Sequence, residues 1–253
     1  MIDLHAHVLP GLDDGVRSPE EAVALAREAV AAGVTTMAAT PHVRDDYPTT
    51  PEQMESGVAA LRARLAAEGI PLDLVHGAEL SIDRAGSFDR DTLRRLTIAQ
   101  RDRHLLLEFP YVGWPIMLEA LIERLGELGL TAILAHPERN PQVQERPERL
   151  EAAVRAGALV QLTAASVLGQ SGRSARRTSE RLLRIGLAHL LAGDSHGPGS
   201  RGTLAAAAAE LGDERLARRL SQEVPAAICA GEAVPAAPRH HGSRWGRRRR
   251  AAL

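Results

Sequence analysis

The chain has 253 residues, of which 44% are hydrophobic and 25% charged, values ordinary for a globular protein. This length suits one large domain or two small ones, and no apolar run reaches the roughly 18 residues that a membrane span needs. The first residues lack the basic and apolar segments of a secretory signal, so we expect a cytoplasmic protein. The single cysteine, Cys229, excludes an internal disulfide and a thiolate-rich metal site.

All 31 basic residues are arginine, because the sequence contains no lysine. This excludes lysine Schiff-base chemistry and a phosphate-binding P-loop. The net charge is −1, but residues 239–253 carry six arginines and no acid, so residues 1–238 carry −7. The acidic body offers no basic face, and a chain with only six aromatic residues offers no stacking surface, so we expect no nucleic-acid binding.

Short apolar segments recur along the chain and predict seven β-strands, at residues 1–5, 34–40, 72–76, 104–109, 131–135, 158–162 and 188–192. Helical patterns that end at a glycine occupy most of the spaces between them, at residues 18–32, 51–68, 114–128, 146–155 and 176–185. In the first of these helices, Ser18 is the predicted N-cap, Pro19 occupies the first turn and Glu21 completes a capping box.

This alternation of strand and helix predicts an α/β fold, with parallel strands joined by crossover helices. Seven such units without a linker favour a closed or nearly closed TIM-like (β/α)7 barrel, because about 250 residues is a usual barrel size. A doubly wound open sheet is the alternative. We expect one domain over residues 1–233 and a disordered Pro/Arg-rich tail over 234–253, which is either solvated or attracted to anionic lipid or an acidic partner.

Residues able to bind a metal follow nearly every predicted strand at its C-terminal end. In a β/α barrel these ends converge on one mouth, so ligands far apart in the sequence can meet there. Only the sixth strand lacks an ionisable residue at this end, where it offers Gln161 and Thr163. The nine candidate ligands are His5, His7, Asp14, His42, Glu79, Glu108, His136, Asp194 and His196.

The residue types in this set narrow the choice of metal and reaction. His5 and His7 are two positions apart, so both rings lie on one face of an extended strand. Five histidines and four carboxylates suit manganese, iron or zinc better than magnesium or copper(I). Because one ion takes about four to six ligands, nine candidates imply two or three ions. Such a cluster makes hydroxide available near neutral pH, which favours hydrolysis.

Two arginines point to a phosphate substrate. Arg139 follows the candidate ligand His136, and Arg201 lies in a glycine-rich loop after His196. Guanidinium groups beside a metal cluster can bind a phosphate dianion and stabilise its transfer, although either arginine could also be an ordinary surface residue.

Three further residues have smaller predicted roles. Asp13 flanks Asp14 and could replace it as a ligand, and Asp3 could orient an imidazole from behind. Cys229 lies in an apolar segment and is interpreted as a buried, inert thiol, so cysteine-dependent phosphatase chemistry is rejected.

Several motifs occur together and in order: MIDLHAHVLPGLDDG at the start, TPH ending at His42, GAE ending at Glu79, LLLEFP around Glu108, AHPER around His136 and GDSH around Asp194. Together they resemble the bacterial PHP (polymerase and histidinol phosphatase) superfamily. More specifically, they are similar to its manganese-dependent tyrosine-phosphatase branch, from capsular and exopolysaccharide gene clusters. The resemblance covers roughly residues 1–230 and ends before the tail.

The resemblance implies a distorted barrel of seven β/α units with three metal ions. On the family's pattern, the first ion is held by His5, His7, Glu79 and Asp194, the second by Glu79, Glu108 and His136, and the third by Asp14, His42 and His196. Arg139 and Arg201 match the arginines that hold the substrate phosphate. The implied substrate is phosphotyrosine, typically in the tail of a bacterial tyrosine autokinase that regulates polysaccharide export.

The leading hypothesis is therefore a metal-dependent protein-tyrosine phosphatase, a phosphoric monoester hydrolase that uses metal-activated hydroxide. One alternative is a small-molecule phosphomonoesterase such as histidinol phosphatase, which would enclose its substrate more fully. Another is a non-catalytic metal-binding regulatory module, which the complete ligand set disfavours. A nuclease is disfavoured by the acidic body.

Overall fold

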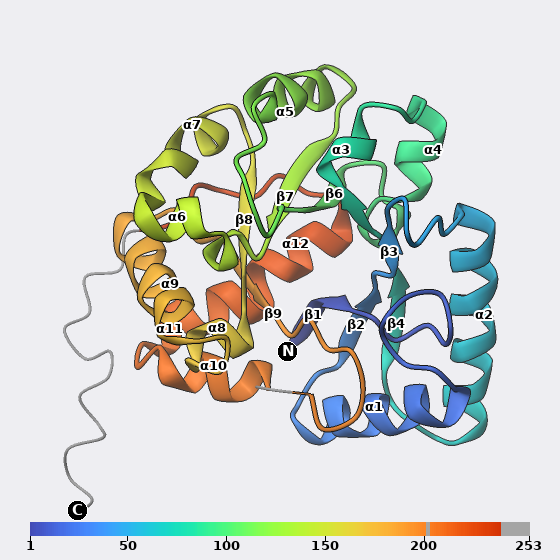
Figure 1. The fold of residues 1–253 in the computed structure, drawn as a ribbon. Helices are drawn as coiled ribbons and strands as arrows, with labels where there is room; N and C mark the ends of the chain where they lie inside the picture. Colours follow the sequence, from blue (N-terminus) through green and yellow to red (C-terminus); the bar gives the residue numbers. More distant parts are fainter. Residues whose placement is uncertain (201–202, 239–253) are drawn as a thin grey trace, which may run out of the picture.

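In the computed structural model, which describes residues 1–200 and 203–238, parallel strands form a ring surrounded by helices (Figure 1). The strands are β1 (Ile2–Ala6), β2 (Thr36–Ala39), β3 (His42–Val43), β4 (Asp73–His76), β5 (Glu79–Ser81), β6 (His104–Glu108), β7 (Thr131–Ala135), β8 (Leu159–Thr163) and β9 (Leu190–Ala192). All seven predicted strands are confirmed to within two residues at each end. The short strands β3 and β5 were not predicted.

The strands pair in two parallel sheets, β1-β2-β4 and β3-β5-β6-β7-β8-β9. Only Thr40 and Pro41 separate β3 from β2, and only two residues separate β5 from β4, so each short strand continues its predecessor along the chain. Pro41 has no N–H to donate, which interrupts the ladder at this point. The seven predicted strands and their two continuations thus occupy seven positions in the ring.

The ring closes between β9 and β1. The backbone N–H of Asp194 donates to the His5 carbonyl at 2.8 Å, and the His7 N–H donates to the Ser195 carbonyl at 2.9 Å. This closure makes the fold a barrel and not an open sheet. Between β4 and β6 the barrel is distorted, because the 3-10 turn η1 (Ile98–Gln100) packs against both strands there.

Helices surround the ring, and the last of them, α12, covers one of its ends (Figure 1). They are α1 (Pro19–Ala31), α2 (Pro51–Ala67), α3 (Ile82–Ala85), α4 (Arg90–Arg95), α5 (Leu118–Glu127), α6 (Pro141–Glu145), α7 (Leu150–Arg155), α8 (Ala164–Val167), α9 (Arg173–Ile185), α10 (Leu204–Glu210), α11 (Glu214–Arg218) and α12 (Val224–Ala230), with the short turns η2 (Pro137–Arg139), η3 (Pro147–Arg149) and η4 (Arg219–Glu223). No helix in residues 1–200 and 203–238 is long and apolar enough to cross a membrane.

Several helix starts differ from the prediction in their position or their cap. The helices predicted from residues 146 and 176 begin at Leu150, after the turn η3, and at Arg173. Ser18 caps α1 as expected, but the Glu21 carboxylate accepts from the Arg17 N–H at 2.7 Å, so the predicted capping box is wrong. The helix predicted from Trp114 begins only at Leu118. Because Pro115 disfavours helical geometry in the residue before it, the preceding residues form a loop.

The last helix closes one end of the barrel. Val224 and Ile228 of α12 pack in one cluster with Leu4, Ile133 and Leu190 from the barrel strands. In Figure 1, α12 lies across the ring. The apolar contacts fill the barrel beneath the strands' C-terminal ends, which leaves the opposite mouth for polar side chains. The predicted tail, residues 234–238 apart, lies outside the described residues.

Candidate metal centre

All nine predicted ligands meet at the C-terminal mouth of the barrel, where they form overlapping groups whose ligand atoms lie within 4.8 Å of one another. The two unpredicted strands explain part of this convergence. His42 is the first residue of β3 and Glu79 the first of β5, and the two residues pair in register. The short continuations therefore carry these side chains toward the mouth. Glu108 ends β6, and His136 follows β7.

Two carboxylates, Glu79 and Asp194, lie close to both His5 and His7. His5 Nε2 lies 3.3 Å from His7 Nε2, 3.2 Å from Glu79 Oε2 and 3.4 Å from Asp194 Oδ1. His7 Nε2 lies 3.4 Å and 3.5 Å from the same two oxygens. In each trio, His5–His7–Glu79 and His5–His7–Asp194, spacings of 3.2–3.5 Å between ligand atoms suit bonds of about 2 Å to one ion. We call this group the four-ligand site.

Glu79 also contacts two histidines outside the four-ligand site. Its Oε1 is 2.7 Å from His136 Nε2, and its Oε2 is 3.0 Å from His42 Nδ1. Glu79 is fully buried, and among the described residues its Oε2 accepts no hydrogen bond. A buried carboxylate oxygen without a donor, surrounded by imidazole nitrogens, fits a metal ligand.

The remaining ligands form a more open group. Asp14 Oδ1 lies 3.5 Å from both His42 Nε2 and His196 Nε2. Glu108 differs from the family's pattern, because its Oε2 groups with His42 and Glu79 and not with His136. All the side chains of the three predicted ligand sets thus lie at the mouth, but they group differently, because His42 belongs to two groups.

Hydrogen bonds behind the rings set their orientation. His5 Nδ1 lies 3.0 Å from Gln161 Oε1, the residue that the sixth predicted strand offers instead of an ionisable one. His7 Nδ1 lies 2.6 Å from Asp13 Oδ2. An Nδ1–H that donates to these acceptors leaves the Nε2 lone pair facing the centre. Asp13 therefore lies behind a ligand and does not take the place of Asp14.

Asp3 supports the backbone of the site and not an imidazole ring. Its buried carboxylate accepts from the N–H of Gly193 at 2.8 Å and of His5 at 3.2 Å. A side chain at Gly193 would collide with this carboxylate, because a Cβ there would lie 2.4 Å from Asp3 Oδ2. His136 and Asp194 both adopt positive φ, 39° and 56°, a strained geometry typical of functional sites.

The carboxylates give the site a field that favours cations. Although burial lowers the pKa of His5, the charges of Glu79 and Asp194 raise it to about 9. Burial acts against ionisation of Glu79, but the imidazoles around it hold its pKa well below the usual value. The pKa of Glu108 is raised, mainly by burial and to a smaller extent by the negative charge of Glu79. A divalent cation would take the place of the protons on the rings.

Arg139 borders the four-ligand site. Its Nη1 lies 2.7 Å from Asp194 Oδ2, and its Nη2 donates to Thr163 Oγ1 at 3.2 Å. The side chain is 20% exposed, so it can meet a ligand that enters the mouth. Arg201, the second predicted arginine, lies outside the described residues.

Two residues at the mouth were missed by the sequence analysis. Tyr111 stacks its ring on His136 at 5.6 Å, and its hydroxyl accepts from Arg139 at 3.3 Å. Arg44 donates to Glu108 Oε1 at 2.8 Å. The sequence did contain a signal for Arg44, because it lies two residues after His42, and side chains two positions apart on a strand point to the same face.

The family model for capsular polysaccharide synthesis proteins of the CpsB/CapC type matches residues 1–229. This chain belongs to the CpsB/CapC family. The predicted resemblance to the capsule-related phosphatase branch is therefore confirmed.

Relatives of this CpsB/CapC protein carry phosphatase names. The chain is 35% identical over 198 residues to tyrosine-protein phosphatase YwqE of Bacillus subtilis (strain 168), a match that covers 78% of this chain and 77% of that protein. It is 28% identical over 210 residues to tyrosine-protein phosphatase CpsB of Streptococcus pneumoniae, covering 79% and 85%.

The fold is also similar to solved structures. A structure from the work titled "Crystal structures of YwqE from Bacillus subtilis and CpsB from Streptococcus pneumoniae, unique metal-dependent tyrosine phosphatases" superposes with a TM-score of 0.85 and 31% identity, over 96% of this chain and 100% of that one. A β-aspartyl dipeptidase from Fervidobacterium islandicum gives a TM-score of 0.51 at 15% identity, over 94% and 75%, and shares the fold alone.

Proposed function

We propose that this protein is a metal-dependent tyrosine-protein phosphatase that hydrolyses phosphotyrosine in protein substrates. The observation that carries the proposal is the four-ligand site with Arg139 beside it, because a metal centre next to a guanidinium group suits a phosphate monoester. Membership of the CpsB/CapC family and the phosphatase names of the relatives support it.

We assign the nine side chains to two or three ions of manganese, with iron or zinc as alternatives, because the donors are imidazoles and carboxylates only. The orphaned Glu79 Oε2 supports this fit. His5, His7, Glu79 and Asp194 would hold one ion, and Asp14, His42 and His196 another. Glu79 and Glu108 would hold a further ion together with His42, and His136, which the family's pattern assigns to this ion, contacts it through Glu79.

The protein's own side chains position the substrate. When bound, the ions would supply Lewis-acid charge and lower the pKa of water. Arg139, held by Thr163 and Tyr111, presents its guanidinium group to the phosphate oxygens, and Arg201 is proposed as a second phosphate ligand. The half-exposed Tyr111 ring can stack with the phenyl ring of the substrate at the entrance.

We further propose that the phosphotyrosine belongs to a bacterial tyrosine autokinase that controls capsule or exopolysaccharide synthesis. The description of the family model, capsular polysaccharide synthesis, supports this proposal. Such a substrate would place the reaction in the cytoplasm.

The test measures hydrolysis of a phosphotyrosine peptide, p-nitrophenyl phosphate and histidinol phosphate by the purified protein, after treatment with EDTA and after addition of manganese, iron or zinc. We expect metal-dependent turnover that favours the peptide. Arg139→Ala should lower kcat/KM by about a hundredfold, because charged hydrogen bonds to the phosphate are lost in the transition state. Arg155→Ala, which removes an exposed arginine of α7, is the matched control and should leave kcat/KM unchanged.

Three results would contradict the proposal. Preference for histidinol phosphate would make the protein a small-molecule phosphatase. Full metal loading without turnover of any substrate would indicate a binding module. Full activity of Arg139→Ala would remove the phosphate role of this residue.

A further inference from the structure

Large apolar side chains are exposed at one place beside the mouth. Among the described residues, the exposed large hydrophobics all lie between β6 and α5, where Tyr111 is 51% exposed, Val112 83%, Ile116 88% and Met117 69%. Large apolar groups gathered in so short a segment are unusual on a soluble protein and typically mark an interaction surface.

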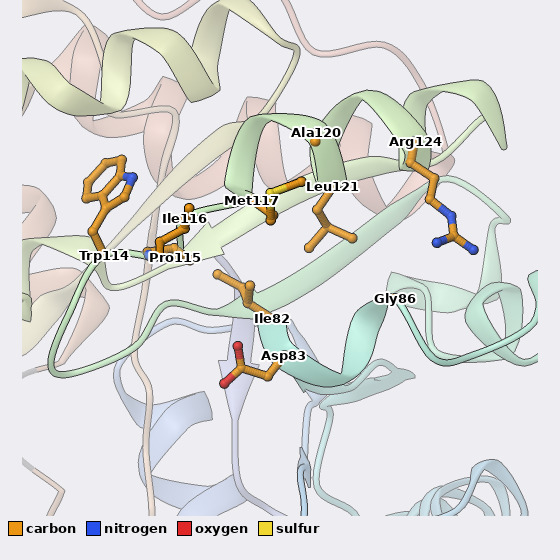
Figure 2. Close-up of a pocket in the computed structure, with 10 residues that line it drawn as sticks. All are labelled: Ile82, Asp83, Gly86, Trp114, Pro115, Ile116, Met117, Ala120, Leu121 and Arg124. Atoms are coloured by element: carbon orange, nitrogen blue, oxygen red, sulfur yellow. The ribbon is translucent and has the colours of Figure 1, made fainter.

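This segment borders a cavity of about 570 Å³ between α3 and α5. Figure 2 shows Ile82 of α3 and Leu121 of α5 pointing into the same space, with Ile116 and Met117 at its edge. We call Ile82, Trp114, Ile116, Met117 and Leu121 the apolar lip. The charged residues that line the cavity, Asp83 and Arg124, are opposite in sign. The cavity therefore favours an apolar side chain over a charged one.

The apolar lip is continuous with the candidate metal centre at both of its ends. The segment that supplies Trp114, Ile116 and Met117 begins at Tyr111, which contacts His136 and Arg139. On the other side, Ile82 comes three residues after Glu79, and three residues span at most about 10 Å. An extended peptide advances about 3.3 Å per residue, so a few residues bridge this distance.

We propose that the apolar lip binds the substrate polypeptide next to the phosphotyrosine, by burying one large aliphatic or aromatic side chain within about four residues of it. The inference rests on the proposed phosphatase function. A second copy of this chain is a poorer occupant, because a protein seated on a surface that begins at Tyr111 would obstruct the mouth beside Arg139.

The test uses phosphotyrosine peptides with serine at all flanking positions except one, where leucine is moved from four residues before the phosphotyrosine to four residues after it. For the manganese-loaded wild type, we expect leucine at one or two positions to raise kcat/KM about tenfold over the all-serine peptide, chiefly through KM. This ratio corresponds to about 1.4 kcal/mol. Dividing by kcat/KM for p-nitrophenyl phosphate corrects each variant for changes at the metal centre.

Matched variants locate the effect. Ile116→Ser and Met117→Ser should each lower the leucine-to-serine ratio from about ten toward one, because their side chains line the cavity. Val112→Ser removes an equally exposed side chain of the same segment that does not line the cavity, so the ratio should stay near ten. Circular dichroism of each variant verifies that the fold is kept.

Several outcomes would overturn the inference. They are a wild type with no leucine preference at any position, a preference that survives both cavity variants, or an equal loss in Val112→Ser. A wild-type dimer in sedimentation velocity that Ile116→Ser dissociates, together with no leucine preference, would assign the surface to self-association. If p-nitrophenyl phosphate and every phosphotyrosine peptide resist hydrolysis, the proposed function itself fails, which is a different result from hydrolysis without leucine preference.

Discussion

Asp13 connects three parts of the mouth through one carboxylate. Its Oδ2 lies 2.6 Å from His7 Nδ1 and accepts from the His42 N–H at 2.9 Å, while its Oδ1 accepts from the Gly15 N–H at 3.0 Å. Burial opposes ionisation of Asp13, but the bond to His7 holds its pKa below the usual value. The carboxylate thus fixes the ring and increases its basicity toward a cation.

We expect Asp13→Asn to weaken manganese binding by about tenfold to a hundredfold, because the amide loses the charge that orients and polarises His7. Isothermal titration calorimetry of the EDTA-treated protein measures this directly. Asp45→Asn, at an exposed aspartate of the same rim, serves as the control and should bind as the wild type does. Unchanged affinity of Asp13→Asn would show that the hydrogen bond does not support the site.

At the scale of the elements, β8 and β9 are joined through a histidine ring. The ring of His189, just before β9, accepts the Val160 N–H on its Nδ1 at 3.1 Å, and the backbone N–H of His189 donates to the Val160 carbonyl at 2.9 Å. Burial lowers the pKa of His189 to about 4, so the ring is neutral in the native protein. A proton on Nδ1 would break the bond to Val160.

Stability should therefore fall as the pH drops from about 6.5 to about 4. In this window the unfolded chain binds a proton at His189 and the native protein does not, so protonation favours unfolding. Between pH 7.5 and pH 5 the loss from this group is about 2 kcal/mol. Urea unfolding in EDTA at both pH values, with wild type and His189→Gln, measures it. Equal losses in the two proteins would rule out this role of His189.

The elements also show what sequence patterns can and cannot predict. The seven predicted strands could be recognised because apolar runs between glycine-terminated helices are strong local signals. β3 and β5 begin within two residues of the strands before them, so no helix separates them in the sequence as it does the others. The error at α1 arose because the Ser18-x-x-Glu21 pattern does not reveal that the Arg17 N–H competes for the same carboxylate.

For the candidate site too, part of the arrangement could be predicted from the sequence and part could not. Barrel topology alone predicts that side chains after the strands converge, so the nine residues that meet at the mouth could be named in advance as candidate ligands. The choice between adjacent aspartates at 13 and 14 depends on which rotamer faces the centre, and spacing does not encode it. The position of Glu108 near His42 likewise depends on side-chain packing.

For the whole molecule, α12 is the counterpart of the metal centre at the other end of the barrel. Ile228 is fully buried in the cluster that includes Leu4, Leu106 and Ile133. These contacts couple the end of the described chain to strands from its beginning and middle.

Ile228→Ala should lower the free energy of unfolding by about 2 to 4 kcal/mol, because the truncation leaves a cavity in a packed core. Urea unfolding measures the loss. Ala226→Gly, at an exposed position of the same helix outside the apolar cluster, should cost only about 1 kcal/mol. If the two variants lost equal stability, the contribution of α12 would come from helix propensity and not from closing the barrel.

The closure of the ring by β1 and β9 has a consequence for synthesis of the protein on the ribosome. His5 emerges first, but its partner Asp194 lies 189 positions later, and α12 follows later still. A nascent chain that ends before Asp194 holds two imidazoles and a glutamate without the fourth donor. Assembly of the four-ligand site must therefore wait until Asp194 has left the exit tunnel, so a cation that needs all four donors can be bound only after most of the barrel has been synthesised.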